Sequence, residues 1–347
     1  LQAWAAEGAR VRIPTTLNPA GADLAAWRSL GFTEHFVQKQ QAVIAAYVDL
    51  GAIPTCTCTP YLVGHVPEFG QHVAWAESSA VSYANSVLGA RTNREGGPSA
   101  LAAAVTGRTA RYGLHIAENR RATTVVEVRC HVRSVADSGA LGFLVGRQVG
   151  RSVPLFRFRD RGLVASLLRQ LGAAMASNGS VALYHVEGVT PEAQAENVLA
   201  PDAQTIVVDD LGPGYAALDG ASPEVDVVSL GCPHASLAEL EAVAACLDGR
   251  EVRAALWITT SRAIRELAHE SGVLSRIEKA GGKVVADTCM VVAPVDELGF
   301  RSLATNSGKM ALYAPSHGGL DTRFGSMERC LEAAVTGRWP DSQPTVS

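Results

Sequence analysis

The chain has 347 residues, of which 47% are hydrophobic and 18% charged, with a formal net charge of −4. This is enough apolar material for one large domain or two to three ordinary ones. Lysines and arginines form no basic cluster, which argues against a nucleic-acid-binding protein. Charges, Gly or Pro interrupt every apolar run before the ~20 residues that a membrane span needs. The seven cysteines are an odd, sparse set, so we expect a reducing, cytoplasmic setting and no disulfide framework.

Short β-rich runs alternate with Ala-rich helical stretches, which predicts an α/β fold with mostly parallel strands. The N-terminal segment resembles a short helix and not a secretory signal, so we expect a processed or truncated fragment. The predicted strands are 11–13, 123–132, 181–185, 204–208, 225–229, 254–259 and 283–287, and the predicted helices are 162–177, 235–247 and 261–271. Ser236 and Glu239 have the spacing of a capping box at the start of the second helix.

Changes in composition near 112–122 and 280–290 predict two units. An α/β unit over 116–284 is expected to be inserted into an outer unit formed by 1–115 together with 285–338. The remaining tail, 339–347, is predicted to be disordered.

Three cysteines lie in turns that contain Pro or follow β-like runs: Cys58, Cys232 and Cys289. Open α/β sheets bind ligands at such strand ends, so the three thiolates could converge on one metal or iron–sulfur cluster. There is no CxxC pair, and spacing alone favours the alternative of three independent buried thiols. The other cysteines are predicted to be buried core residues (Cys130, Cys246 and Cys330) or, for Cys56, to share a face with Cys58 if the segment is extended.

A polar block over 75–94 follows the first of these cysteines. Ser78 and Ser79 suit the start of a helix, where hydroxyl and backbone N–H groups can hold an anion. Asn85, Arg91 and Arg94 would add donors for a carboxylate or phosphate. The alternative is a capped helix followed by a loop with solvated arginines.

Two further clusters could take part in chemistry. His185 ends a predicted strand, and Glu187 follows on the same face, so the pair could perform acid/base work, although a satisfied strand-end histidine is commoner. The polar turn from Thr305 to Lys309 could face a small anionic substrate or be an ordinary capped turn. It lacks the spacing of a nucleotide-binding loop.

Together these motifs resemble the catalytic region of aconitase X. The resemblance keeps its order from about residue 10 to 338 and rests on TTLNPAG (15–21), TCTPYL (57–62), WAESSAVSYANSVLGARTNREGG (75–97), HVEGVTPE (185–192), LGCPH (230–234), DTCMV (287–291) and TNSGK (305–309). It implies an aconitase-like, multi-layer α/β/α catalytic region with mostly parallel sheets, lacking the swivel domain of the superfamily.

The resemblance also implies a cofactor and a partner. Cys58, Cys232 and Cys289 match the family's iron–sulfur ligands, although the cluster's nuclearity is left open and iron alone remains an alternative. The missing swivel domain carries the serine expected to handle the proton. We therefore expect a small swivel-domain subunit or a fused swivel domain as partner, and we also expect a family N-terminal segment that is missing before Leu1.

The activity implied is elimination of water from a small 3-hydroxy acid. We favour cis-3-hydroxy-L-proline as substrate, giving pyrroline-2-carboxylate in hydroxyproline catabolism, with mevalonate 5-phosphate as the alternative. Two rivals are a non-catalytic subunit with a degenerate pocket and a metal-free enzyme using Cys58 beside His234 or His185. The candidate residues are Ser78, Ser79, Lys309, His185 and Glu187 for catalysis, and Asn85, Arg91, Thr305, Asn306 and Ser307 for substrate binding.

Overall fold

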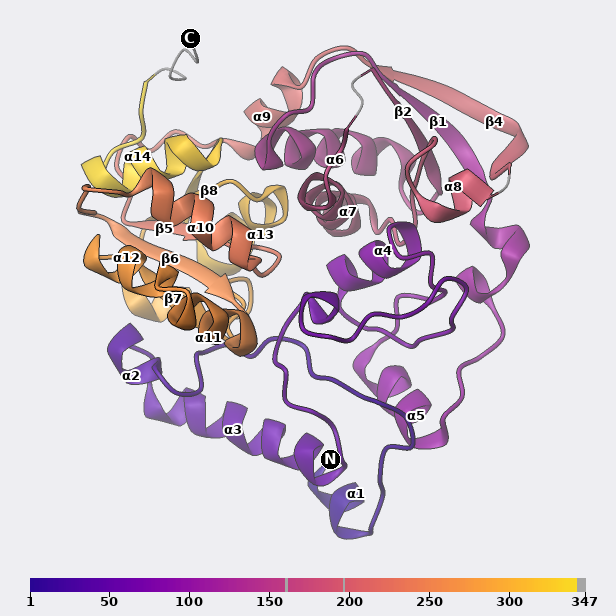
Figure 1. The fold of residues 1–347 in the computed structure, drawn as a ribbon, viewed down its shortest axis with the longest axis horizontal. Helices are drawn as coiled ribbons and strands as arrows, with labels where there is room; N and C mark the ends of the chain where they lie inside the picture. Colours follow the sequence, from indigo (N-terminus) through magenta and orange to yellow (C-terminus); the bar gives the residue numbers. More distant parts are fainter. Residues whose placement is uncertain (160–161, 196, 342–347) are drawn as a thin grey trace. The chain divides into compact units, whose positions relative to one another are not determined.

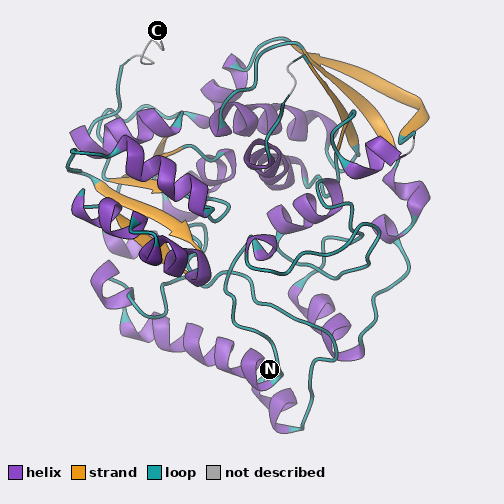
Figure 2. Ribbon diagram, in the orientation of Figure 1, coloured by secondary structure: helices purple, strands orange, loops and turns teal. Residues whose placement is uncertain are grey.

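The computed structural model describes residues 1–159, 162–195 and 197–341 (Figure 1). They form two compact units, which we describe separately. Unit 1 contains Leu1–Arg10, Thr16–Val63 and the described residues from Ala216 on, and unit 2 contains Val11–Thr15 and Gly64–Tyr215. Figure 2 shows that each unit combines strands with helices. None of the helices in these ranges combines the length and apolar character that a membrane span requires.

Unit 1 is built on a parallel sheet with the strand order β7-β6-β5-β8-β9. The strands are β5 (Val227–Leu230), β6 (Ala255–Thr260), β7 (Lys283–Ala286), β8 (Ser302–Thr305) and β9 (Asp321–Phe324). The chain builds outward from β5 through β6 to β7, then returns to the other side of β5 for β8 and β9. The strand order therefore reverses between β5 and β8, where open α/β sheets leave a ligand-binding crevice at the carboxyl ends.

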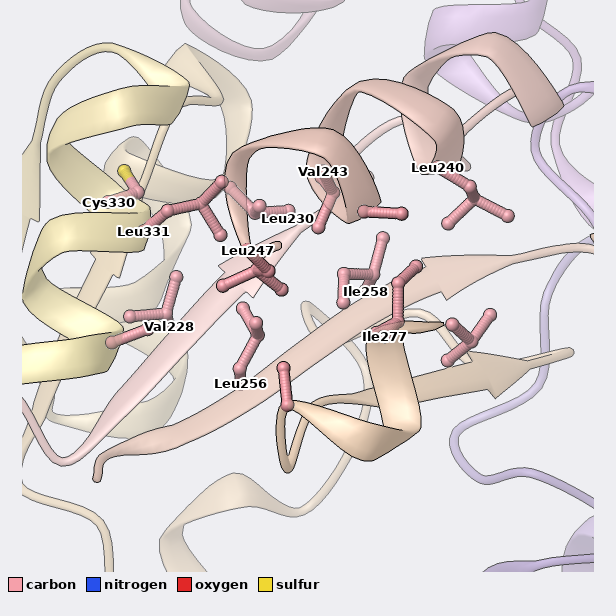
Figure 3. Close-up of a cluster of buried hydrophobic side chains, with 14 of the residues drawn as sticks. Val228, Leu230, Leu240, Val243, Leu247, Leu256, Ile258, Ile277, Cys330 and Leu331 are labelled. Atoms are coloured by element: carbon pink, nitrogen blue, oxygen red, sulfur yellow. The ribbon is translucent and has the colours of Figure 1, made fainter. Parts of the chain in front are cut away.

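Helices cover both faces of this sheet. The helices of unit 1 are α1 (Gln2–Ala6), which has no buried residue, α2 (Trp27–Leu30), α3 (Glu34–Asp49), α10 (Leu237–Cys246), α11 (Arg262–Glu270), α12 (Val273–Lys279), α13 (Gly308–Gly318) and α14 (Met327–Thr336), with the short 3-10 turns η1 (Pro60–Leu62) and η4 (Val295–Leu298). Alternate strand residues point to opposite faces. Val228 and Leu256 belong to a core with α10, α12 and α14 (Figure 3), whereas Val227 and Trp257 belong to a core with α2, α3 and α13.

Unit 2 has a second parallel sheet with the order β3-β2-β1-β4. Its elements are α4 (Ser78–Ser86), α5 (Gly97–Thr106), η2 (Gly113–His115), η3 (Ala117–Arg120), β1 (Ala122–Val128), α6 (Val135–Val149), β2 (Pro154–Phe158), α7 (Ala165–Gly179), β3 (His185–Val186), α8 (Pro191–Ala195) and β4 (Leu199–Val208), and α9 (Gly212–Leu218) runs across the boundary between the units. Glycines let α6 and α7 approach closely, since a Cβ at Gly179 would lie 2.0 Å from the Gly146 carbonyl oxygen.

The parallel α/β class predicted from the sequence is confirmed, as is the start of α10. Ser236 accepts a hydrogen bond from the Glu239 N–H (3.3 Å), and the Glu239 carboxylate accepts one from the Ser236 N–H (2.8 Å), completing the capping box. Two predicted strands are wrong: residues 11–13 form no strand, and only His185 of 181–185 lies in one. The prediction also missed β2, β8 and β9, which have four or five residues and include Arg or Thr.

The units divide the chain at other positions than the sequence analysis expected. Composition placed β5, β6 and β7 in a middle unit over 116–284, but these strands pair with β8 and β9 in one sheet. The predicted disordered tail begins too early, because Trp339 is buried in the core around α14 and its backbone N–H donates to the Pro223 carbonyl oxygen. Residues 342–347 of that predicted tail lie outside the described residues.

Candidate functional site

The carboxyl edge of the unit 1 sheet gathers three of the motifs noted in the sequence. Cys232 follows the end of β5, Cys289 follows β7, and the turn from Thr305 to Lys309 follows β8. The first and third of these segments flank the point where the strand order reverses. The sequence placed Cys232 and Cys289 in turns after β-like runs and the third segment only in a polar turn, and the sheet topology brings all three to a single edge.

The turn that presents Cys232 depends on Gly231. Gly231 has φ +83°, and a Cβ there would lie 2.1 Å from the Thr259 carbonyl oxygen, so only glycine fits. The Thr259 hydroxyl donates to the Gly231 carbonyl at 2.6 Å, which fixes the turn to β6. The peptide bond between Cys232 and Pro233 is cis. The thiol-bearing residue is thus held on a rigid strand end and is only 8% exposed.

The segment TTLNPAG connects the loops of the other two cysteines. Its Leu17 carbonyl accepts a hydrogen bond from the Thr57 N–H at 3.1 Å, next to Cys58. At its other end, Ala20 accepts from the Cys289 N–H at 2.9 Å and donates to the Asp287 carbonyl at 2.7 Å. This motif therefore acts as a backbone bridge between the Cys58 and Cys289 loops.

His234 joins all three cysteine loops. It lies two residues after Cys232, and its backbone N–H donates to the Cys58 sulfur at 3.2 Å. Its ring Nδ1 is 2.9 Å from the Thr57 hydroxyl, and its Nε2 is 2.8 Å from the Thr288 carbonyl oxygen. His234, Thr57 and Thr288 are all at most 2% exposed. One buried side chain thus contacts the residue preceding Cys58 and the residue preceding Cys289.

An ion cluster lies beside the Cys289 loop. The Arg262 guanidinium binds Asp23 (2.8 Å) and Asp287, and the left-handed φ of Asp287 (+60°) turns the chain toward Cys289. Burial raises the pKa of Asp287 despite the opposing effect of Arg262. Burial acts the same way on Asp23, but hydrogen bonds from Ala26, Arg262 and other donors outweigh it and lower the pKa. The cluster is a rigid support for the loop.

Cys56 does not share a face with Cys58. Its φ of +43° breaks the extended conformation that the shared face would require. Burial, with the nearby Asp287 charge, raises the pKa of Cys56 to about 12. Among the predicted core cysteines, Cys330 is fully buried, whereas Cys130 and Cys246 are partly exposed.

The three thiols supply the donor type that iron–sulfur clusters use. Three thiolates on one tetrahedral ion, each about 2.3 Å from it, lie within about 4 Å of one another. Among the described residues, no three His, Cys, Asp or Glu side chains are placed to hold a metal ion in this way. Soft thiolates are the usual ligands of iron–sulfur clusters. The donor set of Cys58, Cys232 and Cys289 is therefore compatible with an iron–sulfur cluster.

The turn after β8 supplies a cation and an amide to the same edge. Thr305 accepts a hydrogen bond from the Ser307 N–H (3.2 Å), and the Ser307 hydroxyl caps α13 by accepting from Met310 (3.2 Å). These two side chains shape the turn. Lys309 lies in the first turn of α13 and is 7% exposed, and Asn306 is partly buried. Of the four predicted residues here, Asn306 and Lys309 remain the candidates for contact with substrate.

The serine-rich block of unit 2 packs helix α4 into that unit. Ser82 lies against Gly172 of α7, where a Cβ on the glycine would be 2.7 Å from the serine oxygen. Ser86 accepts a hydrogen bond from the Tyr184 N–H at 2.9 Å. The Ser79 hydroxyl and N–H both donate to the Glu77 carboxylate. An acidic side chain thus occupies the helix start where we expected a substrate anion.

Asn85 is a structural hub. Its Nδ2 donates to the carbonyls of Thr92 and Ala182, and its Oδ1 accepts from Thr92 N–H and Arg120, each at 2.9–3.0 Å. An amide offers two donors and two acceptor positions, so these bonds use all of them. Asn85 has no capacity left for a substrate, which corrects its predicted role.

The buried partner of His185 differs from the one expected. Glu187 lies just beyond β3, which ends at Val186. Its side chain is exposed and binds Arg157 at 2.9 Å. His185 Nε2 instead donates to the Arg120 carbonyl (2.8 Å) and lies 3.9 Å from Glu192. The Arg120 guanidinium uses all five donors, one of them to Glu192 at 2.7 Å. Burial lowers the pKa of Arg120, while Glu192 opposes that shift.

Arg91 lines a cavity of about 100 Å³ in unit 2. The other lining residues are Ala117, Glu118, Arg120, Arg121, Glu192, Asn197 and Val198. The buried Nε of Arg91 has no hydrogen-bond partner within the described residues. The neighbouring Arg94 donates to the Ala176 carbonyl at 3.2 Å and so helps to fasten α7.

Sequence reasoning missed several residues that organise the thiol loops of unit 1 and the hydrogen bonds around Asn85 and His185 in unit 2. Thr57, Thr288, Arg120 and Glu192 were not singled out, and His234 was considered only as a base for Cys58. Thr57 and Thr288 directly precede cysteines in quoted motifs, which was the available signal. Arg120 gave no local signal, since its partners Asn85 and Glu192 are 35 and 72 residues away.

Comparison with known proteins identifies related sequences along nearly all of the chain. The first, second and third domains of aconitase X match residues 1–118, 122–211 and 225–336. The phosphomevalonate dehydratase large subunit of Methanothermobacter thermautotrophicus is 51% identical over 320 residues, which cover 92% of this chain and 80% of that protein. Its counterpart in Methanocaldococcus jannaschii is 45% identical and covers 96% and 84%.

Other relatives differ in named substrate but agree in family. The cis-3-hydroxy-L-proline dehydratase of Pseudomonas aeruginosa is 39% identical, covering 97% of this chain and 60% of that protein. The crystal structure of Thermococcus kodakaraensis aconitase X in its holo-form has a TM-score of 0.89 and 43% identity, covering 96% and 83% of the two chains. The sequence relatives named here are dehydratases, and the predicted α/β class and family are confirmed. The chain is therefore a hydro-lyase that belongs to the aconitase X family.

Proposed function

We propose that this chain is the large subunit of a dehydratase that removes water from mevalonate 5-phosphate. The observation that carries this choice is the pattern of relatives: phosphomevalonate dehydratase large subunits at 51% and 45% identity, against 39% for a cis-3-hydroxy-L-proline dehydratase. This ordering favours the alternative substrate over the one that the sequence analysis preferred. The name "large subunit" also supports a small partner subunit for this chain.

The reaction breaks the bond between C3 and its hydroxyl group and removes a proton from C2, so that a C2=C3 double bond forms and water leaves. Cys58, Cys232 and Cys289 would hold the iron–sulfur cluster at the carboxyl edge of the unit 1 sheet. When bound, the cluster would supply Lewis-acid activation of the departing hydroxyl. The proton would go to a serine of the small subunit, the role that the resemblance assigns to the swivel domain.

Lys309 and Asn306 are the residues of unit 1 that we assign to the substrate. They follow β8, next to the Cys232 turn on β5, so they lie beside the thiol loops on the same edge. A buried ammonium group can pair with a carboxylate or phosphate, and an amide can donate to the same anion. These two residues would hold the substrate while the C3 hydroxyl departs.

The hydrogen bonds of His234 argue against the metal-free alternative in unit 1. Both ring nitrogens of His234 are engaged, with Thr57 and Thr288, and the group that contacts the Cys58 sulfur is the backbone N–H. Each ring nitrogen thus has a hydrogen-bond partner other than the thiol. This geometry supports a structural role for His234 and a ligand role for Cys58.

The test is anaerobic reconstitution of the full chain with iron and sulfide, together with a small subunit, followed by assays of both substrates. We expect kcat/KM for mevalonate 5-phosphate to exceed that for cis-3-hydroxy-L-proline at least tenfold. Cys232→Ser should abolish iron uptake and activity, whereas Cys246→Ser, a partly exposed cysteine of the same unit, should retain both. Preference for the proline substrate would refute the substrate, and full activity of Cys232→Ser would refute the ligand assignment.

A further inference from the structure

His234 is buried where three loops meet, and the chemistry of its partners fixes the direction of the bond at Nε2. The Thr288 carbonyl can only accept, so His234 Nε2 carries the hydrogen. In the neutral ring, Nδ1 is then an acceptor, and the Thr57 hydroxyl donates to it. The Thr57 oxygen in turn accepts from the Thr59 N–H at 3.1 Å. With the ring neutral, the bonds of His234 to Thr57 and Thr288 each have a defined donor and acceptor.

The network connects segments that are distant in sequence. Thr57 is 177 residues from His234, and Thr288 is 54 residues from it. Each of these partners is the immediate neighbour of a cysteine, and His234 itself lies two residues after the third. On the carboxyl side of His234, Ala235 is fixed to β6, since its N–H donates to Thr259 and its carbonyl accepts from the Thr260 hydroxyl at 2.6 Å. The ring is therefore attached to the sheet and reaches out to both other loops.

We propose that His234 is a positioning residue that holds the Cys58 and Cys289 loops at the spacing a three-thiolate cluster requires. This inference rests on the proposed function for the identity of the group held. Residues that orient the direct ligands of a metal typically change its affinity by about 10- to 100-fold when they are replaced. His234 acts through Thr57 and Thr288, and its own ring does not ligate the metal.

Two conservative variants separate the two halves of the network. The side-chain amide of Asn occupies approximately the position of Nδ1, so His234→Asn keeps a partner for Thr57 and loses the bond to Thr288. The longer Gln places its amide near Nε2, so His234→Gln keeps the donor to Thr288 and loses the partner of Thr57. His234→Ala removes both bonds, while the backbone N–H to Cys58 is present in all three variants.

The first readout is the alkylation rate of each cysteine in the metal-free full chain, measured by mass spectrometry. A loop that loses its fastening opens more often and exposes its thiol. We expect His234→Asn to accelerate modification of Cys289 at least tenfold over Cys58, and His234→Gln to show the opposite preference. Equal acceleration of both thiols in both variants would indicate general loosening of the unit and would overturn the proposal, as would unchanged rates in His234→Ala.

The second readout is metal binding, with Co²⁺ alone as the probe and its thiolate absorbance as the signal, followed by iron and sulfide content after reconstitution. His234→Ala should weaken Co²⁺ binding at least tenfold, with partial recovery in the Asn and Gln variants. Thr322→Val is the matched control, because Thr322 is a buried threonine of unit 1 whose hydroxyl donates to the Leu320 carbonyl (3.1 Å), outside the network. A control variant that binds as weakly as His234→Ala would overturn the proposal.

Different results would overturn the proposed substrate and the proposed role of His234. If the wild-type complex binds iron but does not dehydrate mevalonate 5-phosphate, the proposed substrate is wrong, and the alkylation pattern still tests His234. If the wild-type complex is active and His234→Ala retains full iron content and wild-type alkylation rates, the positioning role is wrong, and the proposed function stands.

Discussion

The carboxyl edge of the unit 1 sheet and helix α4 of unit 2 both carry dense runs of small polar residues, but the structure uses them differently. At the sheet edge, the polar side chains follow strand ends beside the reversal of strand order, where the loops of Cys232 and Cys289 also begin. In α4, Ser82 and Ser86 pack against α7 and the segment before β3. The difference shows that position relative to a sheet edge, and not polarity alone, indicates which residues can meet a substrate.

Each region also has one buried hub with a full set of hydrogen bonds. His234 connects residues that adjoin cysteines, whereas Asn85 connects α4 to Thr92, Ala182 and Arg120. The two hubs look alike in burial and in saturation of their polar atoms. We therefore expect them to differ in consequence: loss of the first should impair metal binding, and loss of the second should impair folding of unit 2.

The largest effect is expected from Arg120→Met. This change leaves the Glu192 carboxylate, which is only 5% exposed, without its partner and removes four further hydrogen bonds. Removing one member of a buried ion pair typically costs about 3–5 kcal/mol. The free energy of unfolding, measured in denaturant, should fall by that amount. Arg157→Met, which breaks a partly exposed pair with Glu187, should cost less than about 1 kcal/mol.

An Arg120→Met variant as stable as Arg157→Met would contradict this ranking. It would mean that unit 2 tolerates the loss of the Arg120 hydrogen bonds to the Asn85 hub.

Lys309→Met should lower kcat/KM about 100-fold, which corresponds to roughly 2.7 kcal/mol of transition-state stabilisation. The methionine keeps the apolar length of a side chain that is 7% exposed but removes the charge that we assign to the substrate. The loss of stability should be much smaller than the loss of activity. Lys279→Met, an exposed lysine of α12, should leave kcat/KM unchanged. Equal activities in the two variants would remove Lys309 from the site.

The sequence predicts the sheet edge better than it predicts α4, and the reason is locality. A turn after a strand is encoded by neighbouring residues, so Cys232 and Cys289 could be placed at strand ends from the sequence, whereas Lys309 was placed only in a polar turn because β8 was missed. The partners of Asn85 and Arg120 come from distant segments, so nothing near Asn85 distinguishes a structural amide from a binding one. For the same reason the role of His234 could not be predicted, because Thr57 and Thr288 reach it only in the folded chain.

The fold shows the same dependence on distance. Strands with longer or more β-branched runs, such as β1 and β6, were predicted to within a few residues. The short strands β8 and β9 were missed because four residues carry little periodicity. Both strands pair on the far side of β5, so the sheet extends past the boundary that we expected between the units. Composition alone does not indicate which strands pair.

Gly172→Ala tests whether α4 is held by close packing. The added methyl group would meet the Ser82 oxygen at 2.7 Å and the Tyr184 ring at 3.0 Å, which should cost about 1–3 kcal/mol. Ser82→Ala alone should be close to neutral, because it removes a buried hydroxyl that has no hydrogen-bond partner within the described residues. In the double variant, part of the cost should be recovered, and a double-mutant cycle on unfolding free energies measures that coupling. Strict additivity would show that the serine is not what Gly172 accommodates.

The smallest effect is expected at the opposite, amino edge of the unit 1 sheet. Backbone N–H groups of Arg301 and Ser302 donate to the Asp226 carboxylate at 2.8 and 3.1 Å, and they lower its pKa from the usual 3.8. A lowered pKa stabilises the folded chain above the unfolded value, and this contribution is lost as pH falls through the folded value. Asp226→Asn should therefore cost at most about 1 kcal/mol at pH 7, and the difference from wild type should shrink below pH 4.

Urea unfolding of both proteins between pH 7 and pH 3 measures this difference, and the dehydratase assay at pH 7 completes the comparison. Because Asp226 precedes β5 at the end remote from Cys232, its replacement should leave kcat/KM unchanged. A stability difference that stays constant with pH would show that the carboxylate charge is not what the two N–H groups stabilise. A loss of activity would show that the amino edge of the sheet also influences the reaction at the carboxyl edge.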